Sequence, residues 1–182
     1  MDNSAASPTN TTKIKDLDIP LERDLFLRTL IRELAGTLQD VVGLKESEGY
    51  ISIVGQSMGA WINSYYKEAL GQSTLSREQI IDVLVDLKAR ICGDFYVVKQ
   101  DEENVMLRNR ECPFGDKVKD RPCMCMMTSN VFGSITADSM KYAKVELRKT
   151  IAKGDRECEV VVHFKRSEAA KLAQGREYFG GE

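Results

Sequence analysis

The chain has 182 residues, of which 42% are apolar and 30% charged, and its net charge is −2. These values are typical of one globular domain with tails, and they exclude the strongly basic surface by which many proteins bind nucleic acid. Every long apolar segment is interrupted by charges and falls short of the roughly 20 residues that span a bilayer. The first residues also lack a basic and apolar leader. We therefore expect a cytoplasmic protein that binds neither membrane nor, directly, nucleic acid.

The first part of the chain predicts a tail followed by three helices. Residues 1–19 are rich in Asn, Ser, Thr and Pro, which favours a disordered tail. A first helix is expected from Pro20 to about Gly43, because apolar residues recur there every three or four positions. They form one face of that helix: Leu27, Leu30, Ile31, Leu34, Leu38 and Val41.

A second helix is expected over residues 49–70, and a third begins at Ser76 and ends near Gly93. Gly55 and Gly59, one turn apart in the second helix, indicate close approach of another backbone or of a ligand, with tight helix packing as the simpler interpretation. The third helix starts with a capping box, in which Ser76 and Gln79 satisfy each other's free backbone amides.

The periodicity then changes to that of strands. Residues 94–99 and 105–109 predict a hairpin, and residues 125–140 a further helix. Residues 143–151 alternate as a half-buried strand that turns at residues 153–155 into a strand beginning at Cys158. This alternation places Cys158 on the inward face and His163, the chain's single histidine, on the outward one.

The order of elements predicts an α+β fold, because helices and strands are segregated along the chain. We expect an N-terminal three-helix segment packed on an antiparallel sheet of about four strands, with one further helix. The domain would cover residues 20–166, and residues 167–182 would add a short helix and a tail.

The candidate functional residues are cysteines. Four of the chain's five cysteines lie between residues 112 and 158, and the candidate metal ligands are Cys112, Cys123, Cys125 and Cys158. Thiolates bind zinc and other thiophilic metals, including iron in iron–sulfur clusters and copper(I). Two alternatives stay open. The cysteines are redox-active, with Cys125 activated as a thiolate in the first turn of a helix, or they are simply buried in the core.

A second candidate site is aromatic. Trp61, Tyr65 and Phe95 are expected to line a ligand pocket between the helices and the sheet, and ordinary core packing is the alternative. The chain carries no nucleotide-binding glycine loop, and the lone His163 offers no Cys-His pair, so a surface position is expected for it.

Several segments resemble the methanogen output domain family. They include residues 26–36, 84–88 and 93–96, the run Cys112-Pro113-Phe114-Gly115, residues 125–133 and 142–146, and Gly154-Asp155 with Cys158. The resemblance covers roughly residues 20–179. It implies signal transduction or transcriptional regulation beside sensor modules, without known chemistry.

The chain is also distantly similar to 4-vinyl reductase-type sensory domains. That resemblance implies a dimeric α+β fold that binds small effectors and often zinc. Cys125 and Cys158 match cysteine positions there, whereas Leu147 and Thr150 stand where that group tends to have a glutamate and a cysteine.

Three functional hypotheses follow. The first is a cytosolic regulatory domain that binds a small effector or metal near Cys112, Cys125 and Cys158, with a sensor kinase or transcription regulator as partner. The second is a small hydrolase with Cys125 as nucleophile. The third is an interaction module, a homodimer formed through the N-terminal helices.

Overall fold

The computed structural model describes residue 14 and residues 18–181, so most of the predicted tail, residues 1–19, lies outside the described residues. The fold is α+β, as predicted. The helices are α1 Arg23–Val42, α2 Leu44–Leu70, α3 Arg77–Ala89, α4 Cys125–Met140 and α5 Glu168–Leu172. The strands are β1 Phe95–Gln100, β2 Asn104–Asn109, β3 Tyr142–Lys149, β4 Cys158–His163 and β5 Arg176–Phe179. Short 3-10 turns cover Gly115–Val118, Pro122–Met124 and Ile151–Lys153.

The N-terminal helices differ from the prediction at their ends. α1 begins at Arg23 rather than at Pro20, because the Glu22 carboxylate accepts the free amides of Asp24 and Leu25 at 3.3 and 2.9 Å. Gly43 ends α1 as expected, with φ +86°, but α2 starts directly after it instead of at residue 49. A helical hairpin with a one-residue connection results.

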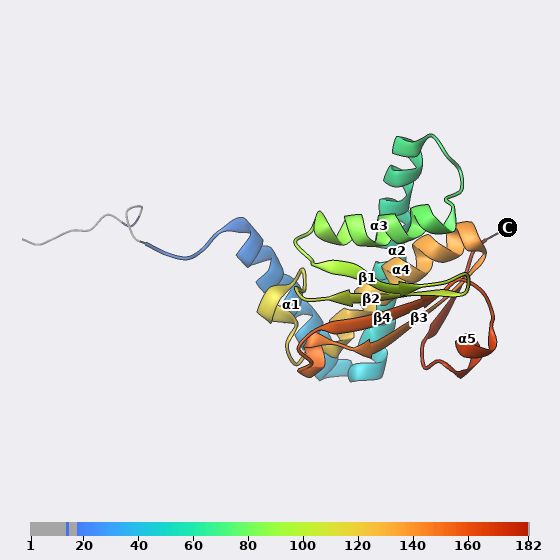
Figure 1. Cartoon of the computed structure of the whole chain (residues 1–182). Helices are drawn as coiled ribbons and strands as arrows, with labels where there is room; N and C mark the ends of the chain where they lie inside the picture. The colour runs from blue at the N-terminus through green and yellow to red at the C-terminus, as the bar shows by residue number, and fades with distance from the viewer. Residues whose placement is uncertain (1–13, 15–17, 182) are drawn as a thin grey trace, which may run out of the picture.

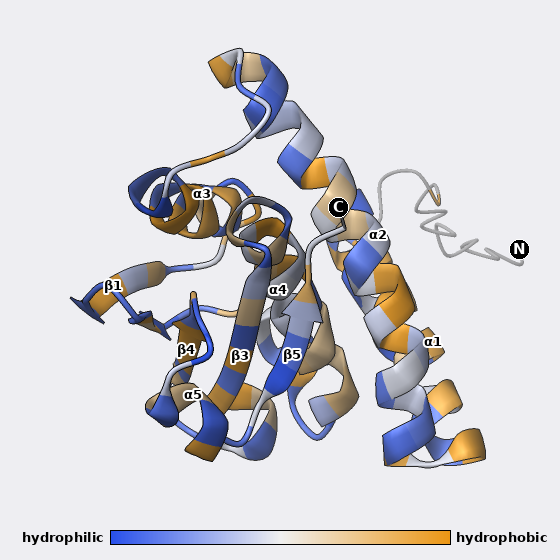
Figure 2. Cartoon of the chain, turned by 90° about the vertical axis from the view of Figure 1, so that its right-hand side faces the viewer, coloured by the Kyte–Doolittle hydropathy of each residue, from blue (hydrophilic) through white to orange (hydrophobic). Residues whose placement is uncertain are grey.

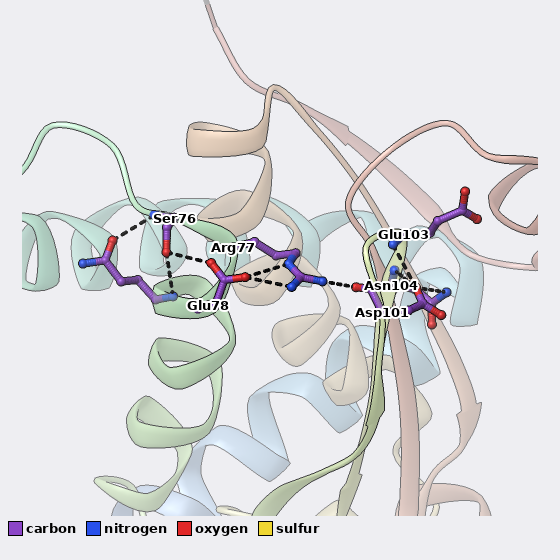
Figure 3. A network of polar contacts seen from close by, with 7 residues as sticks. Ser76, Arg77, Glu78, Asp101, Glu103 and Asn104 are labelled. Atoms are coloured by element: carbon purple, nitrogen blue, oxygen red, sulfur yellow. Dashed lines mark hydrogen bonds and ion pairs between the residues drawn. The ribbon is translucent and has the colours of Figure 1, made fainter.

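α3 is fixed at its N-terminus by a polar network (Figure 3). The predicted capping box is present, with Ser76 and Gln79 bonding each other's backbone amides. Arg77 pairs with Glu78 and donates to the backbone carbonyl of Asp101, in the turn between β1 and β2. The Asp101 carboxylate accepts the amides of Glu103 and Asn104 at 2.8 and 2.9 Å, which lowers its pKa. α3 is therefore tied to the first hairpin.

The described strands form one antiparallel sheet in the order β1-β2-β4-β3-β5. Both predicted hairpins are present. The expected number of strands was too low by one, because β5 lies in the segment that we predicted to be a tail. β5 is only four residues long, too short to show a period, and Tyr178 anchors it by packing against Gly133 of α4.

The elements form layers (Figures 1 and 2). α3 and α4 cover one face of the sheet, and the main core lies between them and the strands. α2 packs on the outside of α4, and α1 packs on α2. α5 lies at the opposite face of the sheet, beside Val161 and His163. The His163 side chain is buried there, so the prediction of a surface histidine was wrong.

Contact between α2 and α4 requires small residues. A Cβ built on Gly55 would lie 2.7 Å from Cβ of Asn130, and one on Gly59 would lie 2.9 Å from Cβ of Ser134. The two glycines thus permit tight helix packing, the simpler of the two interpretations of their spacing. None of the helices in the described part of the chain has the length and apolar character needed to cross a membrane.

Candidate functional site

Three of the four candidate cysteines come together. Cys112 follows β2, Cys125 is the first residue of α4, and Cys158 is the first residue of β4. All three line one small pocket of about 30 Å³ between the sheet and α4. Its other walls are largely apolar, and Leu147 and Thr150 are among them. We call this cavity the thiol pocket.

The fourth cysteine does not line the thiol pocket. Cys123 is fully buried, and its Sγ lies 3.9 Å from the backbone carbonyl of Ala35 in α1. Within residues 14 and 18–181, no group of three or more His, Cys, Asp or Glu side chains is placed to hold a metal ion. Cys123 is therefore apart from the other three candidate ligands, and a metal centre formed by all four thiols stays a prediction.

Burial governs the chemistry of the thiols. Burial raises the pKa of Cys125 to about 12, and the neighbouring Cys158 and Cys112 contribute to this shift. Burial also raises the pKa of Cys112. The expectation of a Cys125 thiolate was wrong, because desolvation of the charged form outweighs the favourable dipole at the start of α4.

Cys158 has a different set of contacts. The backbone N–H of Ile151 approaches its Sγ at 3.4 Å, and the Asn109 side-chain amide lies 4.0 Å away. No histidine or carboxylate is among the described residues that line the pocket. His163 lies on the other face of the sheet, so the chain's single histidine does not pair with Cys125.

The residue that sequence reasoning missed is Lys88. Its side chain is only 4% exposed, and its Nζ donates to Oγ1 of Thr128, a pocket residue, at 2.8 Å. Burial lowers the pKa of Lys88 to about 8, and the three thiols of the pocket oppose this shift. One sequence signal was available, because Lys88 follows Leu84 and Ile81 at helical spacing on the inward face of α3.

The predicted aromatic site is divided between two places. Trp61 and Tyr65 line an open groove of about 820 Å³ between α2 and α3. Phe95 lies in the core instead, edge-to-face with Phe132 at 5.4 Å, and borders the thiol pocket. In the groove, Asp86 accepts a bond from the Tyr66 hydroxyl at 2.5 Å. Burial and this bond raise the pKa of Tyr66 to about 12.

Many of the large apolar side chains of α1 and α2 are exposed, although Ile51, Met58, Ile62 and Tyr66 of α2 pack against the core. The residues that α1 buries completely are Ala35 and Gly36, and those of α2 are Ser47, Ser52, Gly55, Gly59 and Asn63. Most of the apolar stripe predicted for α1 is exposed, and α2 exposes further large apolar residues. We define the α1–α2 surface by its exposed members: Leu27, Leu30, Ile31, Leu34, Val41, Tyr50, Ile53, Val54, Trp61 and Tyr65.

The architecture defines an α+β domain whose antiparallel sheet carries its main helical layer on one face. The profile of the methanogen output domain 1 family matches residues 30–163, most of the chain, and the chain belongs to this family. No curated protein matches it.

A solved structure shares the fold. It is a trafficking protein particle complex subunit 3 from Naegleria fowleri, covalently bound to palmitic acid. The similarity has a TM-score of 0.54 and covers 86% of this chain and 99% of that one. The sequences are 13% identical, so the likeness concerns the fold alone.

Proposed function

We propose that the chain is a regulatory output domain that works as an interaction module. We further propose that it forms a homodimer. The observation that carries this proposal is the inverted arrangement of α1 and α2. Both helices bury mainly small or polar residues and leave many large apolar ones exposed. A contiguous exposed apolar patch marks a protein interface more often than a free surface.

Two further points support self-association. A two-fold dimer needs one self-complementary patch, and two adjacent helices with apolar outer faces supply such a patch. The structural relative is, by its name, a subunit of a multiprotein complex, which agrees with a fold used for interaction. A sensor kinase or transcription regulator remains the proposed downstream partner.

Sedimentation velocity tests this proposal. Leu34 and Ile53 are each 64% exposed, so Leu34→Glu and Ile53→Glu place charges in the α1–α2 surface without disturbing the core. We expect the wild type to sediment as a dimer at micromolar concentration and both variants as monomers. Gln56→Glu is the matched control, since Gln56 is exposed on α2 but outside the apolar surface, and it should remain dimeric.

A monomeric wild type, or dimers that survive both substitutions, would contradict the interface. The chain's single tryptophan adds a second signal, because Trp61 lies in the proposed interface and is 52% exposed. Its emission should shift to shorter wavelength as the protein concentration rises.

A second candidate function is effector binding in the thiol pocket. It is favoured by the convergence of Cys112, Cys125 and Cys158 on one cavity beside a buried amine. A thiophilic metal such as zinc stays a separate proposal. It would require movement of these thiols, and metal analysis of purified protein together with a free-thiol count tests it.

A further inference from the structure

The strand β5 has a free edge. It stands at one end of the sheet order, and β3 is its only strand partner in the described part of the chain. A strand bonds each neighbour with alternate backbone groups, so the amides and carbonyls of β5 that point away from β3 have no strand to pair with. Figure 2 shows β5 as the strand nearest to α2.

A groove of about 630 Å³ runs along this edge. Every residue of β5 from Arg176 to Phe179 borders it, and Gly180 and Gly181 follow. Because successive side chains of a strand point to opposite faces, such an unbroken run borders the groove with the edge of the strand rather than with one face. The opposite wall is α2 between Gln56 and Lys67, and α4 contributes to the lining between them. We call this cavity the α2–β5 groove.

Strand and helix run side by side along the groove. At one end, Nη1 of Arg176 donates to Oγ of Ser52 in α2 at 2.6 Å. At the other end, Gly180 packs on the carbonyl of Ala137, and the next residue of α4, Asp138, pairs with Lys67 of α2.

The dimensions of the groove suit an extended chain. The α2 wall from Gln56 to Lys67 is about 16 Å long, and the four residues of β5 cover about 13 Å. Small side chains keep the space between the walls open, namely Ala60, Ser64, Ser134 and Ala137. A segment of about four or five extended residues matches this length.

A polar group on the α2 wall complements a peptide backbone. Asn63 is 4% exposed, and its Nδ2 donates to Asp138 at 2.9 Å, but its buried Oδ1 has no hydrogen-bond partner among the described residues. A strand added beside β5 turns its second row of amides toward α2, where Asn63 is an acceptor. A buried acceptor without a partner is costly, so an incoming N–H group stabilises the complex.

The charges of the groove indicate which segment fits. Lys67 is neutralised by Asp138, and Glu177 accepts from the Tyr142 hydroxyl at 2.9 Å, on the face of β5 opposite to Arg176. Arg176 forms none of the ion pairs found among the described residues. Its guanidinium has N–H groups besides the one that Ser52 accepts, and these suit a carboxylate.

We propose that the α2–β5 groove binds an extended peptide segment of a partner protein, which joins the sheet as a strand beside β5 and places an acidic side chain at Arg176. Backbone hydrogen bonds to β5 supply affinity, and the contact with Arg176 supplies selectivity. The groove shares no residue with the α1–α2 surface. It is therefore a second interaction surface, independent of self-association.

A random library of short peptides displayed on phage and selected against the full chain supplies the probe. We expect the selected sequences to contain Asp or Glu and to lack proline, because an added strand needs its amides. The most enriched peptide is then synthesised with a fluorescent label and titrated with the full chain by fluorescence anisotropy.

Two variants locate the binding. Arg176→Met removes the cation and should weaken peptide binding by about tenfold or more. Ala60→Phe, at an exposed position of α2, fills the groove without changing Arg176 and should have a similar effect. Lys171→Met on α5, outside the groove, is the matched control and should bind like the wild type, as should Leu34→Glu. Circular dichroism confirms that each variant is folded.

Methylation of the peptide amides tests the added strand. Alternate amides of the bound segment face β5, so N-methyl groups on that set should abolish binding. N-methyl groups on the other set leave the bonds to β5 in place and should weaken binding less.

Several results would overturn the inference. A library without any enriched sequence would reject the groove as a peptide site, and so would a peptide whose affinity is unchanged by Arg176→Met and Ala60→Phe. A peptide that tolerates methylation of both alternate sets binds through its side chains alone, which would reject the added strand. None of these results bears on self-association, because that is measured by sedimentation of the unliganded chain.

Discussion

At the scale of single residues, the cost of burying Lys88 should appear as a pH dependence of stability. Burial lowers its pKa to about 8, whereas an unfolded chain holds this proton up to about 10.4. Between these values the unfolded state binds more protons, so the contribution of Lys88 to the unfolding free energy rises with pH. Lys88→Met removes this contribution. The variant should be the more stable protein below pH 8, by about 3 kcal/mol, and the difference should vanish near pH 10.5.

Urea unfolding of both proteins from pH 6.5 to 10.5 measures this difference. The raised thiol pKa values act in the opposite direction at high pH, but they are present in both proteins and cancel to first order. The exposed substitution Lys99→Met should give a profile parallel to the wild type. A Lys88→Met profile that is also parallel would mean that Lys88 is not desolvated in solution.

Sequence reasoning succeeded for residues whose role follows from local spacing and failed where the role depends on distant partners. The capping box at Ser76 is local, and it was predicted correctly. Cys125 was placed correctly at the start of a helix, but its pKa depends on burial by the sheet and on Cys112 and Cys158. Lys88 was overlooked for the same reason, because only the fold brings Thr128 and the thiols beside it.

At the scale of elements, the α2–α4 contact predicts that glycine-to-alanine substitutions at two positions of α2 change the stability in opposite directions. Gly59→Ala would place a Cβ 2.9 Å from Cβ of Ser134 and 3.2 Å from Cα of Val131, both on α4. Overpacking of this kind costs about 1–3 kcal/mol, more than the gain of about 1 kcal/mol in helix propensity. We expect a net destabilisation of about 1 kcal/mol.

Gly49→Ala in the same helix is the control for this change. No atom lies within 4 Å of the added Cβ, so only the gain in helix propensity remains and the variant should be stabilised by up to about 1 kcal/mol. Urea midpoints that shift in the same direction for both variants would contradict the packing argument.

The sequence shows the apolar stripe of α1, but it does not show whether this stripe faces the core or the solvent. An apolar stripe predicts a buried face, yet the domain buries Ala35 and Gly36 while the stripe lies outside. A stripe that covers a partner has the same spacing as one that covers a core. The missed β5 reflects a similar limit, since its place is set by pairing with β3 and by Tyr178 against Gly133.

At the scale of the whole molecule, self-association would make stability depend on concentration. If the exposed faces of α1 and α2 are covered only in the dimer, dimerisation stabilises the folded state by mass action. Each hundredfold increase in protein concentration then adds about 2.7 kcal/mol to the unfolding free energy per dimer. The urea midpoint of the wild type should therefore rise when the protein concentration is increased about a hundredfold, from about 1 to about 100 µM. Leu34→Glu should abolish the dependence.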